Sequence, residues 1–474
     1  MELVQLTLTQ AREALVRKAF SSVEYAQALL QRSAEAKALN AYIAHDDQAL
    51  LAAAAQADAQ GISTSVAMPL GGVPLALKDN INTCALPTSG GTRALLGRVP
   101  PTEAPVAQAL WNAGALLAGK ANMHELAFGV TNNNAVTGAS RNPWGVHLIP
   151  GGSSGGAAVA VAAGMVPAAL GTDTGASVRL PAALCGIVGF RPTVGRYNNS
   201  GVLPISHTRD TVGPLARSVQ DISLLDAVLV GQRTPLPLST APALRGVRLG
   251  VPRSICFTGA QDSVLQVVER ALARLQQQGV ELVEVDMAAL VPLNEAVGFP
   301  VALYEFVQDV SAYLLACGYG LSLQDVAAQI GSADVAAIVA SQLGDQAMPE
   351  EVYQAALQAR HQLQAAYQDL YTRHRISALV FPTSVLTARP IGDDETVDIN
   401  GVRLPTFASY IRNTDAGSNA GIPGISLPAG LASDGLPVGL ELDAPAGHDG
   451  ALLALAYAIE QVLEPMPGAT AWRA

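Results

Sequence analysis

The stretch GGSSGGAAVAVAAGMVPAALGTDTGASVR, residues 151–179, organises the rest of the chain. Its first six residues surround Ser153 and Ser154 with glycines, which let backbone amides approach a ligand closely. The run Ala157–Ala163 is almost entirely alanine and valine and predicts a helix packed at close backbone distance. The segment Gly171–Ser177 predicts a tight turn that presents the Ser177 hydroxyl beside free N–H groups. An oxyanion hole requires this arrangement.

Two other interpretations of GGSSGG stay open on the motif alone. A glycine-rich loop before a helix can bind phosphate, and a glycine-serine loop can simply be flexible. The motif is neither a Walker loop nor G-x-G-x-x-G, because no Lys-Ser/Thr follows the glycines. The surroundings of Ser177 read G-A-S-V-R and so lack the G-x-S-x-G nucleophile elbow.

Taken together, these segments resemble the signature of the amidase signature family of serine hydrolases. In that family GGSSGG is followed by a TDTGGS-R-P-A-like segment, and Thr172–Thr193 reads TDTGASVRLPAALCGIVGFRPT. Upstream, GGVPLALKDN places Lys78 at the family's lysine position. The segment Ser206–Ser218, SHTRDTVGPLARS, is most similar to the indoleacetamide hydrolase and mandelamide hydrolase branch. The resemblance covers nearly the whole chain and is weakest across residues 251–371.

The resemblance implies an α/β amidase signature fold, with a central mixed twisted β-sheet covered by helices on both faces. Alternation of expected strands (246–252 and 279–285) with an amphipathic helix (262–278) also indicates α/β architecture. One domain over residues 1–474 is expected. Its parts are a helical N-terminal segment (1–60), a signature core (71–230) and a variable helical substrate-facing region (290–375).

The chemistry that the resemblance implies is hydrolysis of a carboxamide C–N bond through an acyl-enzyme on Ser177. Ser153, held by a cis Gly152–Ser153 peptide, would relay a proton between Ser177 and Lys78. Amide hydrolysis also needs donors for the oxyanion, here expected from the backbone N–H groups of Thr174, Gly175, Ala176 and Ser177. The products are an acid and ammonia or an amine. No cofactor and no metal are expected.

Lys78 ends an apolar segment that predicts a buried strand. Its structural interpretation is a snorkelling lysine or an ion pair with the adjacent Asp79. Its functional interpretation is a buried base, because burial without a carboxylate partner lowers a lysine pKa. Ala176 stands where the family usually has glycine. Alanine there is strained if the position requires positive φ, and otherwise its methyl group narrows the pocket.

Several polar residues near the signature are assigned structural roles. Asp173 and Arg179 can pair to hold the turn, and Ser154 is expected to be structural. The pair His124–Glu125 is read as ordinary polar residues, because no third ligand has metal spacing. Glu305 could bind a cation or lie at the surface, and the surface position is the favoured interpretation. By resemblance, the tentative substrate-binding residues are Met123, Phe128, Gly152 and Tyr304.

A histidine offers a second candidate base. His207 and Asp210 flank Thr208-Arg209, so a Ser177–His207–Asp210 triad is conceivable, since histidine is the commonest general base. The resemblance instead assigns this role to Lys78 and Ser153.

Composition narrows the possible partners and the compartment. The net charge is −11 with scattered Lys and Arg, so no nucleic-acid partner is expected. Four cysteines without C-x-x-C spacing argue against zinc and disulfides and fit a reducing compartment. The N-terminus lacks signal-peptide features, and apolar runs such as 157–170 are too short to span a bilayer. A cytoplasmic protein with no membrane association is expected, and the resemblance makes a homodimer plausible.

Other activities remain open at this stage. The same acyl-enzyme chemistry serves carbamates, aryl anilides and esters. A glutaminase subunit of a tRNA-dependent amidotransferase would need partner subunits and an ammonia channel. An inactive scaffold of the same fold is disfavoured because Lys78, Ser153 and Ser177 are all present.

Overall fold

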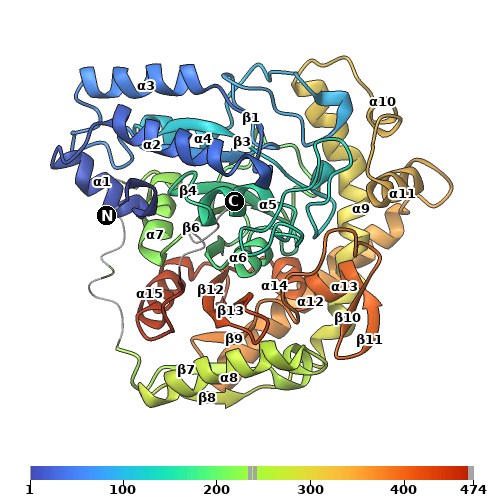
Figure 1. The fold of residues 1–474 in the computed structure, drawn as a ribbon. Coiled ribbons are helices and arrows are strands. Elements are labelled where there is room, and N and C mark those ends of the chain that lie inside the picture. Colours follow the sequence, from blue (N-terminus) through green and yellow to red (C-terminus); the bar gives the residue numbers. More distant parts are fainter. Residues whose placement is uncertain (1, 233–237, 239–242, 468–474) are drawn as a thin grey trace.

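A mixed eleven-stranded sheet runs through the computed structural model, which describes residues 2–232, 238 and 243–467 (Figure 1). The strand order is β1-β3-β2-β4-β6-β5-β12-β13-β9-β7-β8. The strands are β1 (Tyr42–Ala44), β2 (Pro74–Lys78), β3 (Leu116–Ala121), β4 (Ala168–Asp173), β5 (Val188–Arg191), β6 (Thr211–Ala216), β7 (Arg248–Val251), β8 (Glu281–Glu284), β9 (Ala378–Pro382), β12 (Gly424–Leu431) and β13 (Pro437–Asp443). The strands β10 (Thr396–Ile399) and β11 (Val402–Pro405) form a separate hairpin.

Strand directions place two chemically important strand ends side by side. β2 pairs in parallel with both β3 and β4, so the carboxyl ends of these three strands meet at one edge of the sheet. β4 then pairs antiparallel with β6, in a register that sets Asp173 opposite Thr211. The sheet is therefore mixed, as the sequence predicts.

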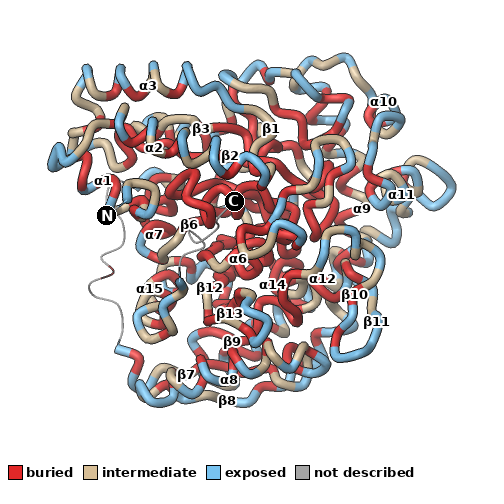
Figure 2. The backbone as a smooth tube through the Cα atoms, viewed as in Figure 1, coloured by how far each residue is buried: buried red, intermediate tan, exposed pale blue. Residues whose placement is uncertain are grey.

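Helices cover both faces of this sheet (Figure 1). They are α1 (Leu8–Val16), α2 (Ser22–Glu35), α3 (Asp47–Ala59), α4 (Pro105–Asn112), α5 (Gly155–Ala162), α6 (Arg179–Cys185), α7 (Val219–Leu229), α8 (Asp262–Gln277), α9 (Leu290–Ala316), α10 (Leu323–Ala327), α11 (Ala333–Leu343), α12 (Glu350–His374), α13 (Thr406–Ile411), α14 (Asp415–Ala420) and α15 (Asp449–Glu460). The buried residues gather in the middle of the molecule, on the sheet and on the helices that pack against it (Figure 2).

The alternation of side chains along β2 separates the two layers. Leu75 and Leu77 belong to the large hydrophobic cluster shared with α4, α7, α8 and α15. Ala76 points to the other face and packs with the small residues of α5 and α6. Lys78 is two residues beyond Ala76, so strand periodicity directs it toward the α5 side.

The small residues of α5 allow a close approach to the sheet edge. A Cβ added to Gly156 would lie 2.4 Å from the Asn122 carbonyl oxygen and 2.5 Å from that of Ala41. Glycine is therefore required at position 156, because a side chain there would collide with the neighbouring backbone.

The N-terminal segment departs in one respect from the expected all-helical structure. Helix α2 begins with a capping box, in which Ser21 Oγ accepts from the Glu24 N–H at 3.1 Å. Residues 42–44, however, form strand β1, which pairs antiparallel with β3. An aromatic and a β-branched residue at this position favour an edge strand over a helix.

Region 290–375 consists of the helices α9, α10, α11 and α12, which gather at one side of the molecule (Figure 1). Within the described residues, α9 alone is long and apolar enough to cross a membrane by length and composition. The expectation that every apolar segment is too short is therefore wrong on those two criteria. Core helices pass the same test, and α9 packs against α10, α11, α12 and α14.

Candidate active site

Lys78 lies at the carboxyl end of β2 and is completely buried. Its Nζ atom donates to Ser153 Oγ at 2.8 Å and to Thr172 Oγ1 at 2.8 Å. Thr172 belongs to the parallel neighbour β4, and its hydroxyl also accepts from Asn80 Nδ2 at 3.1 Å. The lysine is thus surrounded by neutral hydroxyl groups.

Burial lowers the Lys78 pKa from 10.5 to about 7, because removal from water disfavours the charged ammonium. The charges of Asp173 and Asp210 oppose this effect. The Asp79 carboxylate forms no ion pair or hydrogen bond with Lys78. It lies 3.6 Å from the Nζ atom of Lys120, another buried lysine. The interpretation of Lys78 as a partner of its neighbour Asp79 is therefore wrong.

Ser153 stands directly before α5, and the Gly152–Ser153 peptide bond is cis. The next residue, Ser154, ties the loop to the strand: its Oγ donates to the Thr172 carbonyl at 3.1 Å and accepts from the Thr172 N–H at 3.2 Å. The Ser154 N–H donates to the Ser177 carbonyl at 3.2 Å. The two serine-containing segments predicted from the sequence therefore meet.

Ser177 lies between β4 and α6 and retains 8% of its surface exposed. It belongs to the oxyanion turn, which we define as residues 174–177. No residue that the structure describes accepts a hydrogen bond from the backbone N–H groups of this turn. Ala176 is absent from the described non-glycine residues with positive φ, so alanine is unstrained there. Its methyl group instead lines the adjoining pocket.

A buried ion cluster supports the oxyanion turn from below. Asp173 pairs with Arg179 at 3.2 Å and with Arg191 at 3.1 Å, as the sequence predicts for the first pair. Arg179 also contacts Glu441 at 3.0 Å. The two guanidinium groups hold the pKa of the Asp173 carboxyl well below its usual range, despite its burial. Asp173 also accepts from the Val178 N–H at 3.1 Å, which fixes the start of α6.

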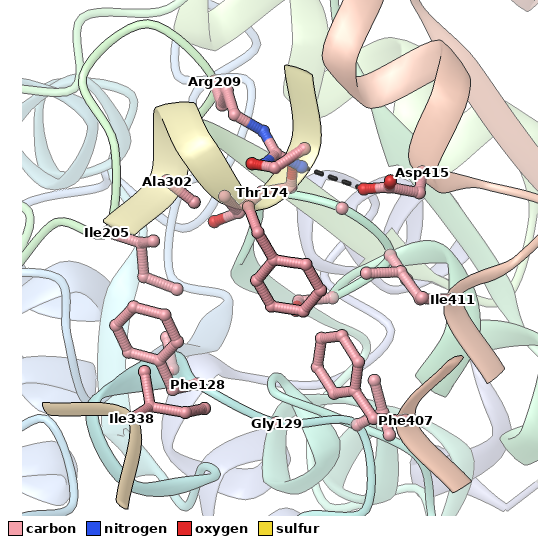
Figure 3. Close-up of a pocket in the computed structure, with 17 residues that line it drawn as sticks. Phe128, Gly129, Thr174, Ile205, Arg209, Ala302, Ile338, Phe407, Ile411 and Asp415 are labelled. Atoms are coloured by element: carbon pink, nitrogen blue, oxygen red, sulfur yellow. Dashed lines mark hydrogen bonds and ion pairs between the residues drawn. The ribbon is translucent and has the colours of Figure 1, made fainter. Parts of the chain in front are cut away.

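An apolar pocket opens beside the oxyanion turn, and all four residues of the turn line it (Figure 3). We call it the aromatic pocket. Its larger apolar lining residues are Phe128, Val130, Ile205, Phe299, Ile338, Phe407 and Ile411, and Ala127, Ala176 and Ala302 complete the apolar lining. At one side it contains a single ion pair, Arg209–Asp415 at 2.9 Å. Such a lining favours a ligand with an apolar body.

Of the four tentative substrate-binding residues, one lines the aromatic pocket and three do not. Phe128 lines the aromatic pocket, in edge contact with Phe306. Met123, Gly152 and Tyr304 lie outside that lining. Met123 is buried in the hydrophobic core, and Tyr304 stacks on Tyr353 with ring centroids 4.1 Å apart. The sequence does not single out four other lining residues, which are Phe299, Phe407, Arg209 and Asp415. Two signals point toward them: Phe299 lies in the expected substrate-facing region 290–375, and Arg209 lies in the segment 206–218 that carries the resemblance.

The histidine alternative fails on geometry. His207 is 60% exposed and faces Asp309, with Nδ1 3.0 Å from Oδ2. Asp210 instead accepts from Thr174 Oγ1 at 2.6 Å and from the backbone of Ile205 and Ser206. These two residues therefore do not form a triad with Ser177.

Glu305 and the His124–Glu125 pair both contact segments that are far away in the sequence. Glu305 is only 1% exposed, so its expected surface position is wrong. It accepts from Thr208 Oγ1 and Tyr353 OH, both at 2.8 Å, and these distant partners explain its burial. His124 contacts Asp334 at 3.1 Å, and the neighbouring Glu125 accepts from the Ser332 N–H at 2.8 Å. This pair joins the core to the region of α11, which fits a structural role.

The fold and the site describe an α/β protein with a buried lysine against a serine and a second serine at the floor of an apolar pocket. Residues 24–453 match the family model described as Amidase. The chain belongs to this family and is an amidase, an enzyme that hydrolyses carboxamide C–N bonds.

Relatives of known identity agree over almost the full length. The chain is 44% identical to an indoleacetamide hydrolase of Agrobacterium vitis, over 96% of this chain and 97% of the relative. It is 40% identical to a mandelamide hydrolase of Pseudomonas putida, over 98% and 93%. A crystal structure of an amidase is similar with a TM-score of 0.85 at 32% identity, covering 97% of this chain and all (100%) of that one.

Proposed function

We propose that the chain hydrolyses small primary carboxamides to the acid and ammonia. In these substrates an aromatic ring is attached to the carbon next to the amide carbonyl. The 2.8 Å contact between Lys78 Nζ and Ser153 Oγ, beside a pocket lined by Phe128, Phe299 and Phe407, carries this proposal. The names of the relatives, indoleacetamide and mandelamide hydrolases, support the same substrate class.

In the proposed mechanism, neutral Lys78 accepts the proton of Ser153, which in turn accepts the proton of Ser177. The Ser177 oxygen attacks the amide carbon, and the oxyanion turn donates N–H groups to the developing negative oxygen. One such donor is worth about 3–4 kcal/mol of transition-state stabilisation. The proton returns through Ser153 to the leaving nitrogen, and ammonia departs. Water then attacks the acyl-enzyme with the same base, which releases the acid and free Ser177.

The electrostatics of the site favour this assignment of the base. A base must be unprotonated at working pH, and the Lys78 pKa of about 7 leaves about half of the molecules neutral at pH 7. The surrounding hydroxyl groups can accept and donate protons in turn. Asp173 cannot hold Lys78 as an ammonium by direct pairing, because Arg179 and Arg191 occupy its oxygens.

The aromatic pocket also weighs against a glutaminase subunit. Glutamine carries an α-amino and an α-carboxylate group, which need charged partners when buried. Arg209 and Asp415 are the charged residues in the lining, and they pair with each other. Carbamates, anilides and esters with apolar acyl groups remain second substrates for the same chemistry.

The test is a substrate panel of indole-3-acetamide, mandelamide, an anilide, a carbamate and glutamine, assayed with the wild type and Ser177→Ala. The proposal expects the fastest turnover on indole-3-acetamide or mandelamide. It expects the loss of all turnover in Ser177→Ala. Faster turnover of glutamine, or residual activity in Ser177→Ala comparable to wild type, would overturn it.

We also propose, from four cysteines that are all free, that the enzyme works in the reducing cytoplasm.

A further inference from the structure

Arg209 reaches both the wall of the aromatic pocket and the oxyanion turn. Its Nη2 atom donates to the Thr174 carbonyl at 3.2 Å and to Asp415 Oδ1 at 2.9 Å. Its Nη1 atom donates to the Gly298 carbonyl of α9. Figure 3 shows Arg209 and Asp415 at one side of the pocket, with Thr174 beside them. One buried guanidinium therefore joins three segments that are far apart in the sequence.

The contact with Thr174 fixes the direction of an amide in the oxyanion turn. Residues 174–177 have trans peptide bonds, in which the C=O and the following N–H point in opposite directions. Because Arg209 holds the Thr174 carbonyl, the Gly175 N–H is directed away from the guanidinium. The Gly175 carbonyl is held in the same way by Arg179 Nη2 at 3.1 Å and Ser418 Oγ at 3.0 Å, which orients the Ala176 N–H.

Asp415 keeps the Arg209 guanidinium in place. Its second oxygen accepts from Asn294 Nδ2 of α9 at 3.1 Å and from Asn419 Nδ2 of α14 at 3.0 Å. A Cβ added to Gly175 would lie 3.2 Å from Asp415 Oδ1, so the turn packs directly on this network. The position of Arg209 is thus set by the two helices that form one wall of the aromatic pocket.

We propose that Arg209 is a positioning residue for amide hydrolysis: it aims the Gly175 N–H at the oxyanion and couples this direction to the pocket wall formed by α9 and α14. The inference rests on the proposed function of Ser177. Arg179 differs in role, because it is buried among Asp173, Glu441 and Asp443 and does not line the pocket. Of these two arginines, only Arg209 lines the pocket, so a bound acyl group can contact it.

The test compares Arg209→Lys with the wild type on indole-3-acetamide. Lysine keeps the charge but lacks the planar fork, so it cannot serve Thr174, Gly298 and Asp415 together. Because a misdirected oxyanion donor acts in the transition state, kcat should fall about 30- to 100-fold while KM changes less than about threefold. Affinity for a boronic-acid analogue of the tetrahedral intermediate should fall by the same factor as kcat/KM. Affinity for the product acid should stay within about threefold.

Arg12→Lys is the matched control. Arg12 is also buried and donates to backbone carbonyls, at 2.9 Å to Met68 and 3.2 Å to Gly71, but lies outside the pocket lining. It should lose melting temperature without a comparable loss of kcat. An unchanged kcat in Arg209→Lys overturns the proposal, and so does an equal loss of affinity for the analogue and the product acid.

A second readout separates this inference from the substrate proposal. A fluorophosphonate labels an activated serine, and its phosphoryl oxygen needs the same donors as the oxyanion. If no amide in the panel is turned over but Ser177 is labelled, a labelling rate at least tenfold lower in Arg209→Lys supports the positioning role. An equal labelling rate overturns that role alone. Failure of the wild type to label overturns both proposals.

Discussion

Protonation of Lys78 should switch the enzyme off in mildly acidic solution. With its pKa at about 7, about half of the Lys78 side chains are neutral at pH 7. A lysine with its ordinary pKa of 10.5 would be neutral in only about 0.03% of molecules at that pH. Burial therefore raises the population of neutral Lys78 at pH 7 by roughly 1,600-fold.

The assay is ammonia release from indole-3-acetamide between pH 5.5 and 9, reported as kcat/KM. The rate should level off above a midpoint near pH 7 and should fall about tenfold per pH unit below it, because the protonated ammonium cannot accept a proton. Lys78→Ala should lose about 10²- to 10⁴-fold at the plateau.

Lys120 supplies the necessary control. It is equally buried, and burial lowers its pKa to about 8, so it also titrates in the range of the assay. Lys120→Arg removes that titration, because arginine stays protonated throughout. The acid limb should persist in Lys120→Arg. The assignment of Lys78 as base would be refuted by any one of three results. These are an acid limb that disappears in Lys120→Arg, a flat profile in the wild type, and full activity in Lys78→Ala.

The same titration predicts how stability changes with pH. The folded-state pKa of Lys78 lies below the unfolded value of 10.5, so between pH 7 and 10.5 the unfolded chain binds more protons than the folded chain. Stability must therefore rise with pH in this window, and below about pH 7 the contribution is constant and unfavourable. Between pH 7 and 9 the gain from Lys78 is about 2 kcal/mol. Urea unfolding at the two pH values should show this gain in the wild type and a smaller one in Lys78→Ala.

Three further substitutions test the surroundings of the site. Asp173→Asn leaves Arg179 and Arg191 without their shared carboxylate and should cost about 3–5 kcal/mol in urea unfolding; a loss below about 1 kcal/mol would contradict the buried ion cluster. Phe128→Ala should raise KM for aryl amides about 10- to 100-fold and leave acetamide hydrolysis unchanged, so an equal effect on both substrates would remove Phe128 from the binding surface. Ala176→Gly should lower stability by about 0.4–1 kcal/mol, because alanine has an ordinary φ there, and a higher melting temperature would instead indicate strain.

The signature could be predicted from the sequence because its parts are local. Glycines, two serines and a small-residue helix lie within residues 151–179, and each carries its own conformational preference. Lys78 could be added because an apolar strand that ends in lysine is rare and the resemblance assigned it a role. The meeting of these segments follows from the parallel pairing of β2 and β4.

The aromatic pocket could not be predicted in the same way, because no sequence pattern brings its walls together. Phe299 is 54% exposed on α9, and Phe407 belongs to α13, yet their ring centroids lie 5.9 Å apart. Glu305 was misplaced for the same reason, since its burial depends on Tyr353 of α12 and on Thr208. Tertiary contacts of this kind leave no trace in local periodicity.

The sequence does contain a physical reason why Lys78 can be neutral although Asp173 lies near it. Asp173 ends β4 near Lys78, and its charge alone would favour the ammonium form. The chain places Arg179 at the first residue of α6 and Arg191 at the end of β5, and both guanidinium groups converge on that carboxylate. Two fixed cations therefore pair with Asp173, and the hydrogen-bond partners of Lys78 are two hydroxyl groups and the Thr172 carbonyl, all of them uncharged. Removing either arginine should leave the Asp173 charge less neutralised, which stabilises the ammonium form of Lys78 and raises its pKa. The acid limb of the pH profile should then move to higher pH. An acid limb at unchanged pH in a folded Arg191→Met variant would show that the arginines serve the turn alone and that desolvation by itself sets the base.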